Sequence, residues 1–255
     1  MRVVCHSCSN TEIVCALGCG HMLVGVDDHS DYPPSILEHV GRVGPDLDLD
    51  VDRVAALAPD LVIASDTVPG HDRLIERMRQ AGLPLLVCAP RNLDDVAADM
   101  LRIGVALGVE RDAHLLAAAF RRSMAPMDAP TPRPRILLEW WPKPVIVPGA
   151  ESWATQMIAL AGGENPWNME AVQSRPVATC EVQSAQPDAI VLSWCGVAED
   201  KYRSHIVRRR PGWAELPAVA KRRIFPISEA LLGRPGPRLI EGLQRLRAVV
   251  QACAE

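Results

Sequence analysis

"VDRVAALAPDLVIAS", residues 51–65, is the stretch that decides the fold. Its first part has the pattern of a short helix that stops before Pro59, because a proline disfavours helical backbone in the residue before it. The apolar run 61–65 has the length and β-branched composition of a buried strand. A helix followed directly by a buried strand is the repeating unit of α/β proteins, so the stretch predicts a parallel sheet covered by helices.

The same alternation continues along the chain. Buried strands are predicted at 2–5, 23–26, 61–65, 85–89, 135–140, 188–194 and 223–228. Helices are predicted at 71–82, about 92–127, 152–161 and 237–252. Gly108 lies in the middle of the longest helical tract, where it would bend or split the helix. The pattern as a whole indicates the α/β class.

A proline-rich segment divides the chain. "APMDAPTPRPR" (125–135) has four prolines, a composition typical of a hinge or boundary, and the strand–helix pattern restarts after it. The segments 56–65 and 184–193 resemble each other in a helix end, Pro-Asp and a buried strand. This echo reflects either two lobes of related build or the general likeness of α/β units. We expect an N-terminal lobe over 1–108, a helix and connection over 109–134, and a C-terminal lobe over 135–255.

Composition excludes several functional classes. The chain has 255 residues with a net charge of −4, so it lacks the basic footprint of a nucleic-acid-binding protein. No apolar run approaches the ~20 residues that a membrane-spanning helix needs, so no membrane insertion is expected. Eight cysteines fit a reducing compartment, and no apolar signal region follows Arg2. The sequence as written predicts a cytoplasmic protein, and a truncated start would instead imply the periplasm or the cell surface.

Ligands of open α/β sheets bind at the carboxyl ends of the strands, which gives a set of candidate residues. The residues that follow predicted strands, or lie in loops near them, are Ser7, Ser9, His29, Asp66, Trp140, Trp141, Trp194, Arg175, Glu229 and Arg234. The serines offer hydroxyl groups near the start of a helix, and the arginines could pair with carboxylate or phosphate groups of a ligand.

The adjacent tryptophans of "EWWPKP" (139–144) are the most informative of these candidates. Side chains alternate between the two faces of a strand, so one tryptophan should enter the core and the other should face ligand. An indole can bury about 200 Å² and suits a broad, flat ligand such as a corrin or porphyrin. The pair therefore predicts a flat apolar platform.

Histidine and cysteine allow competing interpretations. His29 could ligate cobalt or iron, hydrogen-bond an amide, or be an ordinary surface histidine. "CHSCSN" (5–10) contains C-x-x-C, but zinc needs four converging ligands and a second C-x-x-C is missing. A redox pair would fit this strand-to-helix turn, although the rest of the chain does not have the thioredoxin pattern. Cys8 or Cys195 as a nucleophile would make the protein an enzyme, but no GxSxG, P-loop or GxGxxG element supports catalysis.

The motifs together resemble a known family. They are "SNTEIVCALG" (9–18), "LVGVDDHSDYPP" (23–34), "VDRVAALAPDLVIAS" (51–65), "MIALAGGEN" (157–165), "PDAIVLSWCG" (187–196) and "RPGPRLIEGL" (234–243). In this order the chain resembles the helical-backbone class of ABC-transporter substrate-binding proteins, in its cobalamin-type branch, from residue 2 to about 250. The resemblance implies two Rossmann-like α/β lobes joined by a long backbone helix, with the ligand in the cleft between the lobes.

The resemblance also implies a function. The class takes up cobalamin, ferric siderophores and haem, so we expect non-catalytic binding of a corrinoid or related metal chelate by a monomer that needs no cofactor. The alternatives are a ferric-siderophore binder, a metal-ion binder and a cysteine-dependent enzyme. An ABC permease is the expected partner, docked through Asp72 or Glu76 on one lobe and Glu199 or Asp200 on the other. The chain departs from the family in its missing export signal and in Cys8, where proline is common.

Overall fold

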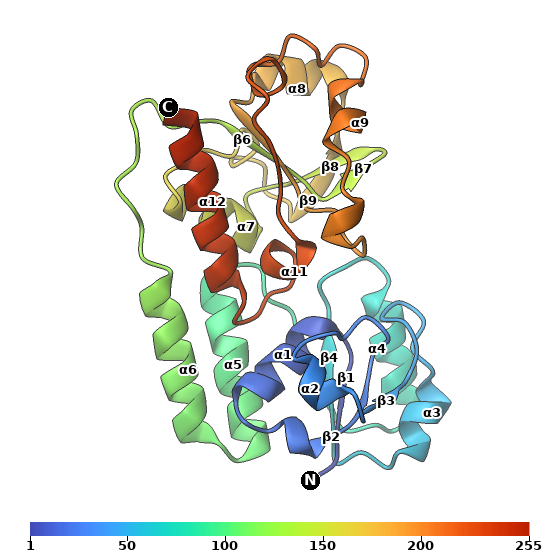
Figure 1. Cartoon of the computed structure of the whole chain (residues 1–255). Coiled ribbons are helices and arrows are strands. Elements are labelled where there is room, and N and C mark those ends of the chain that lie inside the picture. The colour runs from blue at the N-terminus through green and yellow to red at the C-terminus, as the bar shows by residue number, and fades with distance from the viewer. Residues whose placement is uncertain (255) are drawn as a thin grey trace. The chain divides into compact units, whose positions relative to one another are not determined.

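The computed structural model describes residues 1–254 and divides into two compact units, Met1–Arg121 and the chain from Arg122 onward. Each unit contains a parallel β-sheet (Figure 1) and its own buried apolar side chains. The predicted two-lobed α/β fold is confirmed.

The first unit, all of whose residues are described, is built on a five-stranded parallel sheet. Its strands are β1 (Val3–Cys5), β2 (Leu23–Val26), β3 (Gly41–Arg42), β4 (Leu61–Ser65) and β5 (Leu85–Cys88). The order is β3-β2-β1-β4-β5, so the chain runs outward on one side of β1 and then crosses to the other side at β4. This topological switch between β1 and β4 marks the place where open α/β sheets bind ligands.

Helices cover both faces of this sheet. The main ones are α1 (Cys8–Ala16), α3 (Val51–Ala56), α4 (His71–Gln80), α5 (Leu93–Leu107) and α6 (Glu110–Ser123). Val4 and Val62 point to one face, where they join a buried cluster with Val54 of α3 and Leu74 of α4. Alternation sends the neighbouring side chains of β1 and β4 to the other face, where α1 contacts both strands and α5. Figure 1 shows α5 and α6 on one side and α3 and α4 on the other.

The tract predicted as helical over about 92–127 consists of two helices, α5 and α6, separated at Gly108. The Asn92 side chain caps α5 by accepting from Asp95 N at 2.8 Å, and Gly108 ends it with a left-handed φ of 74°. The two helices pack closely because Gly104 has no side chain. A Cβ atom there would lie 2.1 Å from the Cβ of Ala113 on α6.

The second unit contains two sheets. Within residues 122–254, β6 (Ile136–Glu139), β10 (Ala189–Leu192) and β11 (Ile224–Pro226) form a parallel sheet in the order β11-β10-β6. A second, antiparallel sheet of β7 (Trp141–Pro142), β8 (Val145–Pro148) and β9 (Ser174–Val177) was not predicted. Its strands are hard to recognise, because β7 has two residues and β7, β8 and β9 each contain a proline.

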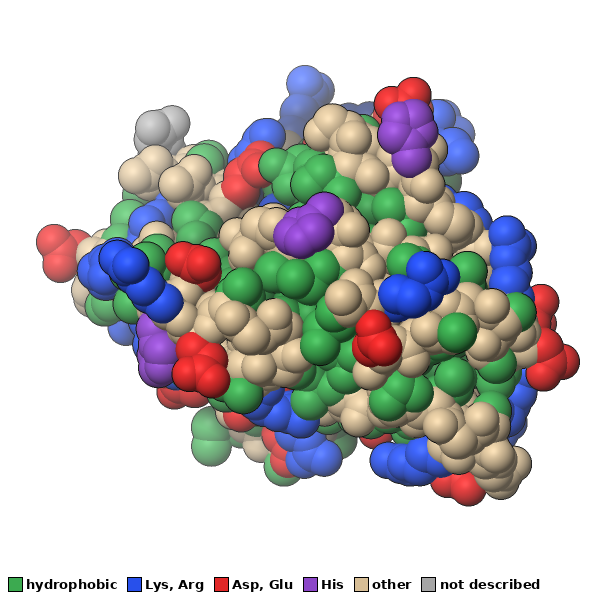
Figure 2. All heavy atoms as spheres, turned by 90° about the horizontal axis from the view of Figure 1, so that it is seen from below, with side chains coloured by type: hydrophobic (Ala, Val, Ile, Leu, Met, Phe, Trp, Pro, Cys, Tyr) green, Lys and Arg blue, Asp and Glu red, His purple; other side chains and the backbone are tan. Residues whose placement is uncertain are grey.

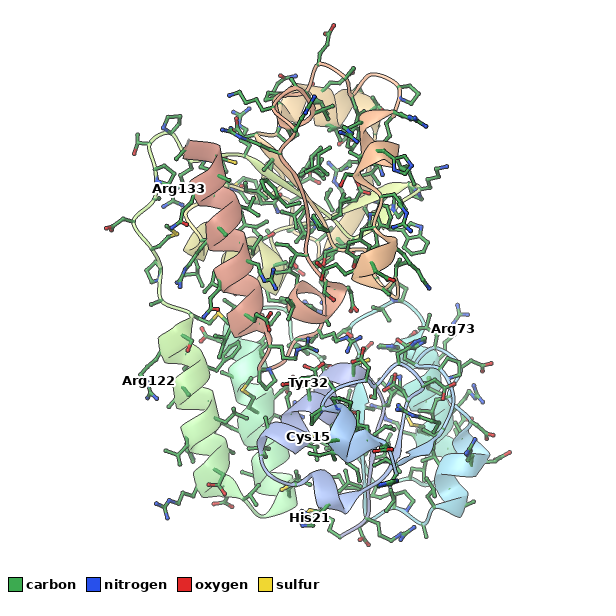
Figure 3. All side chains as sticks on the ribbon, in the orientation of Figure 1. Cys15, His21, Tyr32, Arg73, Arg122 and Arg133 are labelled. Atoms are coloured by element: carbon green, nitrogen blue, oxygen red, sulfur yellow. The ribbon has the colours of Figure 1, made fainter. Side chains whose placement is uncertain are left out.

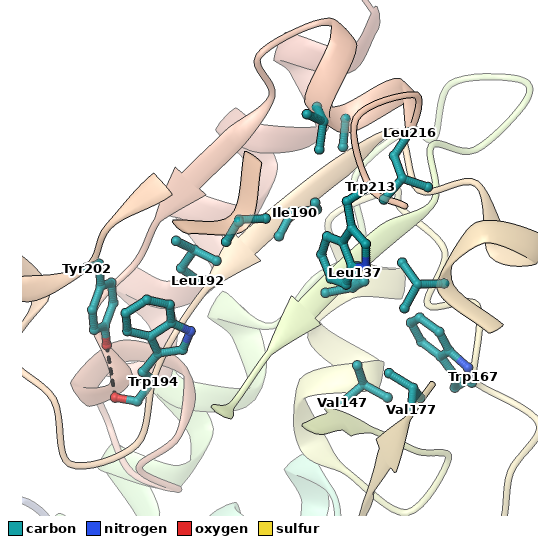
Figure 4. Packing of buried hydrophobic residues seen from close by; sticks show 14 residues of the cluster. Leu137, Val147, Trp167, Val177, Ile190, Leu192, Trp194, Tyr202, Trp213 and Leu216 are labelled. Carbon is teal, nitrogen blue, oxygen red and sulfur yellow. Dashed lines mark hydrogen bonds between the residues drawn. The ribbon is translucent and has the colours of Figure 1, made fainter. Parts of the chain in front are cut away.

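Large aromatic side chains fill the core of the second unit. Trp167 and Trp213 pack with Leu137 of β6 and Ile190 of β10 (Figure 4).

The helices of this unit are α7 (Trp153–Leu160), α8 (Thr179–Ala185), α9 (Ser204–Arg208), α10 (Pro217–Ala220), α11 (Glu229–Leu232) and α12 (Leu239–Ala254). The remaining short elements of the chain are α2 (Pro34–Leu37), η1 (Gly20–Met22) and η2 (Glu199–Lys201).

Among residues 1–254, no helix combines the length and the apolar character needed to cross a bilayer. Side chains of both charges are scattered over the face seen in Figure 2, among hydrophobic side chains and backbone, with most of the charged ones towards its rim. That face therefore lacks the single-sign basic surface that nucleic acid would require.

Candidate functional site

A hydroxyl cluster lies at the topological switch of the first unit, where β1 and β4 end. Ser7 Oγ is 2.7 Å from Ser65 Oγ and 3.0 Å from Ser9 Oγ. Asn10 Nδ2 donates to Ser65 Oγ at 3.0 Å and to Ile63 O at 3.2 Å. The structure thus brings the predicted Ser7 and Ser9 together with Ser65, whose position at the end of a predicted strand already indicated this edge. It adds Asn10, which was not predicted as part of the site.

Ser7 has an unusual backbone conformation, with φ 97° and ψ 146°. Only glycine adopts this region without strain, which costs about 1–3 kcal/mol for other residues. The hydroxyl contacts with Ser65 and Ser9 hold the strained turn in place. Strain of this kind concentrates at ligand-binding positions, so it supports placing the candidate site at this edge.

Buried His6 follows β1 and links this edge to the loop after β3. Its Nδ1 accepts from Ser65 N at 3.2 Å, so the proton lies on Nε2, which donates to Asp46 O at 2.6 Å. The ring packs edge-on against His71, with 4.6 Å between centroids. Burial, and secondarily the neighbouring His71, lowers the pKa of His6 to about 4. His6 is therefore a neutral structural donor at ordinary pH.

Two further histidines, His71 and His29, lie close to the carboxylate of Asp46. Its Oδ2 lies 3.6 Å from Nε2 of buried His71, and its Oδ1 lies 3.8 Å from Nε2 of His29. His71 is the main cause of a lowered pKa of Asp46. Within residues 1–254, no three His, Cys, Asp or Glu side chains are arranged to hold a metal ion. His29 is exposed and beside Asp46, and its role as a metal ligand stays a prediction.

Buried Asp27 organises the loop after β2. Its carboxylate accepts from Ser30 Oγ and from His29 N, the latter at 3.0 Å, and Cys8 Sγ lies 3.8 Å away. Burial raises the pKa of Asp27. It also raises the pKa of Cys5 well above the ordinary thiol value, so this half of C-x-x-C is a buried neutral thiol. The hydrogen bonds to the Asp27 carboxylate thus hold the loop in one conformation, with the His29 side chain exposed to solvent.

Several side chains at this edge are exposed. Asp66, predicted as a ligand contact, follows β4 and faces solvent. Three large apolar side chains are also exposed, namely Tyr32 (labelled in Figure 3), Leu47 and Val68. Leu47 lies beside the turn after Val68, because a Cβ on Gly70 would be 3.5 Å from its Cδ2. Leu47 and Val68 were not predicted, because loop positions carry no periodic pattern. Tyr32 was expected only to fix its loop, but its side chain is exposed.

In the second unit a buried carboxylate occupies the equivalent edge. Glu139, the last residue of β6, is fully buried. Arg210 donates to it through both terminal nitrogens, at 2.5 and 2.7 Å, and Trp194 Nε1 donates at 2.8 Å. The Arg210 guanidinium carbon also lies 4.6 Å from the ring centroid of Trp213. This ion pair and stack were not predicted, because Arg210 is 71 residues from Glu139.

Trp194 is part of the core rather than of an open surface. Only 5% of it is exposed, and its ring lies 5.3 Å from that of Tyr202 (Figure 4). Tyr202 Oη donates to Trp194 O at 3.2 Å and accepts from Glu229 N at 3.2 Å. Burial is the main cause of a raised pKa of Tyr202, which keeps its hydroxyl proton. A ligand can reach little of Trp194 in this position.

The two adjacent tryptophans have the opposite exposures that strand alternation predicted. Trp140 is 9% exposed and belongs to the core, whereas Trp141 on β7 is 41% exposed. The Trp141 indole is oriented by its own turn, because Nε1 donates to Lys143 O at 3.1 Å. Trp141 is therefore the tryptophan of this pair that is available to a ligand.

The remaining candidates lie in two places. Arg234 and Glu229 face each other at 3.4 Å near the start of α11, at the carboxyl edge. Arg175 lies elsewhere, paired with Glu170 and Glu181 at 2.5 and 2.6 Å. It lines a surface hollow that includes Arg135, which directly precedes β6, so it lies towards the amino end of the sheet. The structure thus separates Arg175 from the other candidates.

The four acidic residues expected at a permease are all exposed. Asp72 and Glu76 lie on α4, where Glu76 is 3.7 Å from Arg79, and Glu199 and Asp200 lie on η2. Exposed carboxylates of this kind contribute little to stability. The stability of the core therefore does not depend on these four side chains.

Comparison with known proteins places the chain among binding proteins. The profile of a family described as periplasmic binding protein matches residues 3–231. A relative from Bacillus subtilis strain 168, an uncharacterized ABC transporter substrate-binding lipoprotein, is 29% identical and the match covers 93% of this chain and 76% of the relative. A vitamin B12-binding protein of Vibrio parahaemolyticus is 26% identical, with 99% and 88% covered.

A solved structure of a binding protein is also similar to this chain. The periplasmic heme-binding protein RhuT from Roseiflexus sp. RS-1, in its apo form, superposes with a TM-score of 0.83 and is 28% identical. The match covers 100% of this chain and 99% of that chain. The similarity therefore extends over both units.

Proposed function

Because this chain belongs to the periplasmic binding protein family, we propose that it is the substrate-binding component of an ABC importer and that its ligand is a corrinoid or a related metal chelate. The relatives are named for vitamin B12 and heme, two metal-bearing macrocycles. The protein binds its ligand without transforming it. The ligand-contacting surfaces are the carboxyl edges of the two parallel sheets.

The observation that carries the proposal is the exposed aromatic and apolar surface at these edges. Trp141 presents its indole in the second unit, and Tyr32 and Val68 are exposed in the first. Exposed large apolar side chains at a ligand-binding edge suit a ligand with a broad apolar face. Hydroxyl groups at Ser7 and the imidazole of His29 add hydrogen-bonding partners for the polar rim of such a ligand.

The distribution of charge favours a corrinoid over a ferric siderophore with many anionic groups. In the first unit, Asp28, Asp46 and Asp66 lie in the loops that follow β2, β3 and β4. In the second, Arg210 and Arg234 are each paired with a carboxylate of the protein. Anionic ligands need cations that are not already neutralised. A corrin carries mainly amide groups at its periphery, so its binding does not require cations that are free of other partners.

The test is a tryptophan-fluorescence titration with hydroxocobalamin, cobinamide, haemin and a ferric catecholate siderophore, which is strongly anionic, corrected for inner-filter absorption. We expect saturable quenching by a corrinoid at micromolar concentration or below, and a weaker affinity in Trp141→Ala. Trp167→Phe is the matched control, because Trp167 is buried and lines the hollow near the amino end of the sheet. Quenching by none of the chelates would refute the proposal.

We also propose that the permease docks on the exposed carboxylates of the two units, Asp72 or Glu76 and Glu199 or Asp200. Charge reversal of one residue in each unit, as in Glu76→Lys with Glu199→Lys, should reduce ligand uptake by the reconstituted importer while ligand affinity stays unchanged. Reversal of Glu215, an exposed residue outside this set, is the control. Equal uptake by all variants would contradict this docking surface.

A further inference from the structure

A ligand cannot reach Glu139, because its side chain is fully buried. The residues that contact Glu139 belong to segments next to the proposed ligand surface. The two oxygens of Glu139 accept three hydrogen bonds from Arg210 and Trp194. The Arg210 side chain is itself only 12% exposed. A buried, bidentate Arg–carboxylate pair fixes both position and orientation, because the guanidinium fork matches the two oxygens.

Three separate chain segments meet through this carboxylate. The first follows β6 and carries Trp141, two residues after Glu139. The second follows β10 and carries Trp194, and the third is the segment that contains Arg210 and Trp213. Tyr202 extends the connection from Trp194 to Glu229, at the start of α11. The second segment is also joined to the end of β6 by backbone hydrogen bonds, from Ser193 N to Glu139 O and from Cys195 N to Trp140 O, both at 3.0 Å, whereas Arg210 reaches Glu139 through its side chain.

Stability alone does not account for such a pair. Replacing a buried ion pair by apolar residues of similar volume is often neutral or stabilising, whereas removing one partner leaves an uncompensated charge. What the pair does supply is a defined arrangement of the long connection between β10 and β11, which has only short helices of its own.

We propose that Glu139 is a positioning residue, which pre-organises the carboxyl edge of the second unit for ligand by holding the Arg210 segment and the indole of Trp194 against the end of β6. This inference rests on the proposed function for its ligand-binding consequence, but the positioning itself can be measured without ligand. Glu139 acts through its neighbours and makes no contact with the ligand.

The first measurement is amide hydrogen exchange of the ligand-free protein. In Glu139→Gln, which keeps the size of the side chain but loses its charge, we expect exchange across residues 199–213 and 227–234 to accelerate by about tenfold or more. Exchange in α3 of the first unit should stay unchanged. Arg210→Lys is a second variant, because it keeps the positive charge and loses the fork. Unchanged exchange in both variants would overturn the inference.

The second measurement is the affinity for hydroxocobalamin and haemin by titration. Residues that orient binding groups from behind are worth about tenfold or more in affinity where they have been measured at metal sites, and we expect a loss of that size in Glu139→Gln. Two controls are matched to it. Glu181→Gln loses an arginine contact of 2.6 Å in the same unit, and Val182→Ala destabilises the same core, and both should bind like wild type.

The outcomes separate the two proposals. If the wild-type protein binds neither chelate, the proposed ligand class fails, and the hydrogen-exchange result still decides the positioning role. If Glu139→Gln shows faster exchange in the two segments but normal affinity, the order of these segments does not pre-organise the ligand surface and the inference is overturned. If Val182→Ala loses as much affinity as Glu139→Gln, the effect is general destabilisation, which also overturns it.

Discussion

Ser7 is the residue at which backbone strain and the candidate site coincide. Its φ of 97° and ψ of 146° suit glycine, whereas its hydroxyl bonds to Ser65 and Ser9 need serine. Ser7→Gly and Ser7→Ala both lose the hydroxyl, but only glycine relieves the strain. We expect Ser7→Gly to be more stable than Ser7→Ala by about 1 kcal/mol or more, as measured by urea unfolding. Equal stability of the two variants would show that the turn is unstrained.

His6 gives the protein a defined pH dependence. Its pKa in the fold, about 4, lies below the ordinary value of 6.5, so the unfolded chain binds the extra proton first as the pH falls. The stabilisation is present above pH 6.5 and is lost between 6.5 and about 4, by up to about 3 kcal/mol.

The measurement compares urea unfolding of wild type and His6→Gln across this range. Glutamine keeps an amide donor for Asp46 O but does not titrate. Other groups contribute equally to both proteins, so the difference between their unfolding free energies isolates His6. We expect wild type to lose its advantage as the pH falls. A difference that does not vary with pH would contradict a buried neutral imidazole.

Single residues also show how far the sequence could predict the site. Alternation predicted that one of the two adjacent tryptophans would be buried and the other exposed, because that rule depends on neighbouring residues only, and Trp140 is the buried one. The contact of His6 with Asp46 and that of Glu139 with Arg210 could not be predicted. They join residues 40 and 71 positions apart, and their geometry depends on the packing of loops. The predicted candidates Arg175 and Arg234 do not lie together in the structure. Arg175 instead pairs with Glu170 and Glu181, a contact that also depends on how loops pack.

At the scale of elements, the pairing of α5 with α6 depends on Gly104. Alanine would favour the helix by about 1 kcal/mol on propensity alone. Its Cβ would however lie 2.1 Å from that of Ala113, and overpacking of this kind costs typically 1–3 kcal/mol or more. We expect Gly104→Ala to destabilise the protein in thermal and urea unfolding. The double variant Gly104→Ala with Ala113→Gly should recover much of the loss, and no recovery would place the strain elsewhere.

The elements of the two units were not equally predictable. The parallel strands β1, β4, β6 and β10 are mainly apolar runs buried on both faces, and the sequence shows them clearly. The two-residue strand β3 was not predicted, because Gly41 and Arg42 form no apolar run. The sheet of β7, β8 and β9 was missed because its short strands contain proline and polar residues. The split of the helical tract at Gly108 was foreseeable, since a glycine with a left-handed φ ends a helix.

At the scale of the whole molecule, the central claim is that the protein binds one metal-bearing macrocycle. Each unit has its own core and offers a carboxyl edge with exposed aromatic or apolar side chains. The family assignment and the exposed Trp141 support a chelate ligand, and the paired arginines favour one with few anionic groups.

The most direct test is native mass spectrometry of the protein mixed with an excess of hydroxocobalamin, haemin and a ferric catecholate siderophore, the three ligands being at equal concentration. We expect a one-to-one complex in which the corrinoid mass dominates, with less of it in Trp141→Ala. A spectrum in which the siderophore complex dominates would contradict the charge argument. A spectrum with only free protein, at ligand concentrations well above that of the protein, would contradict the central claim itself.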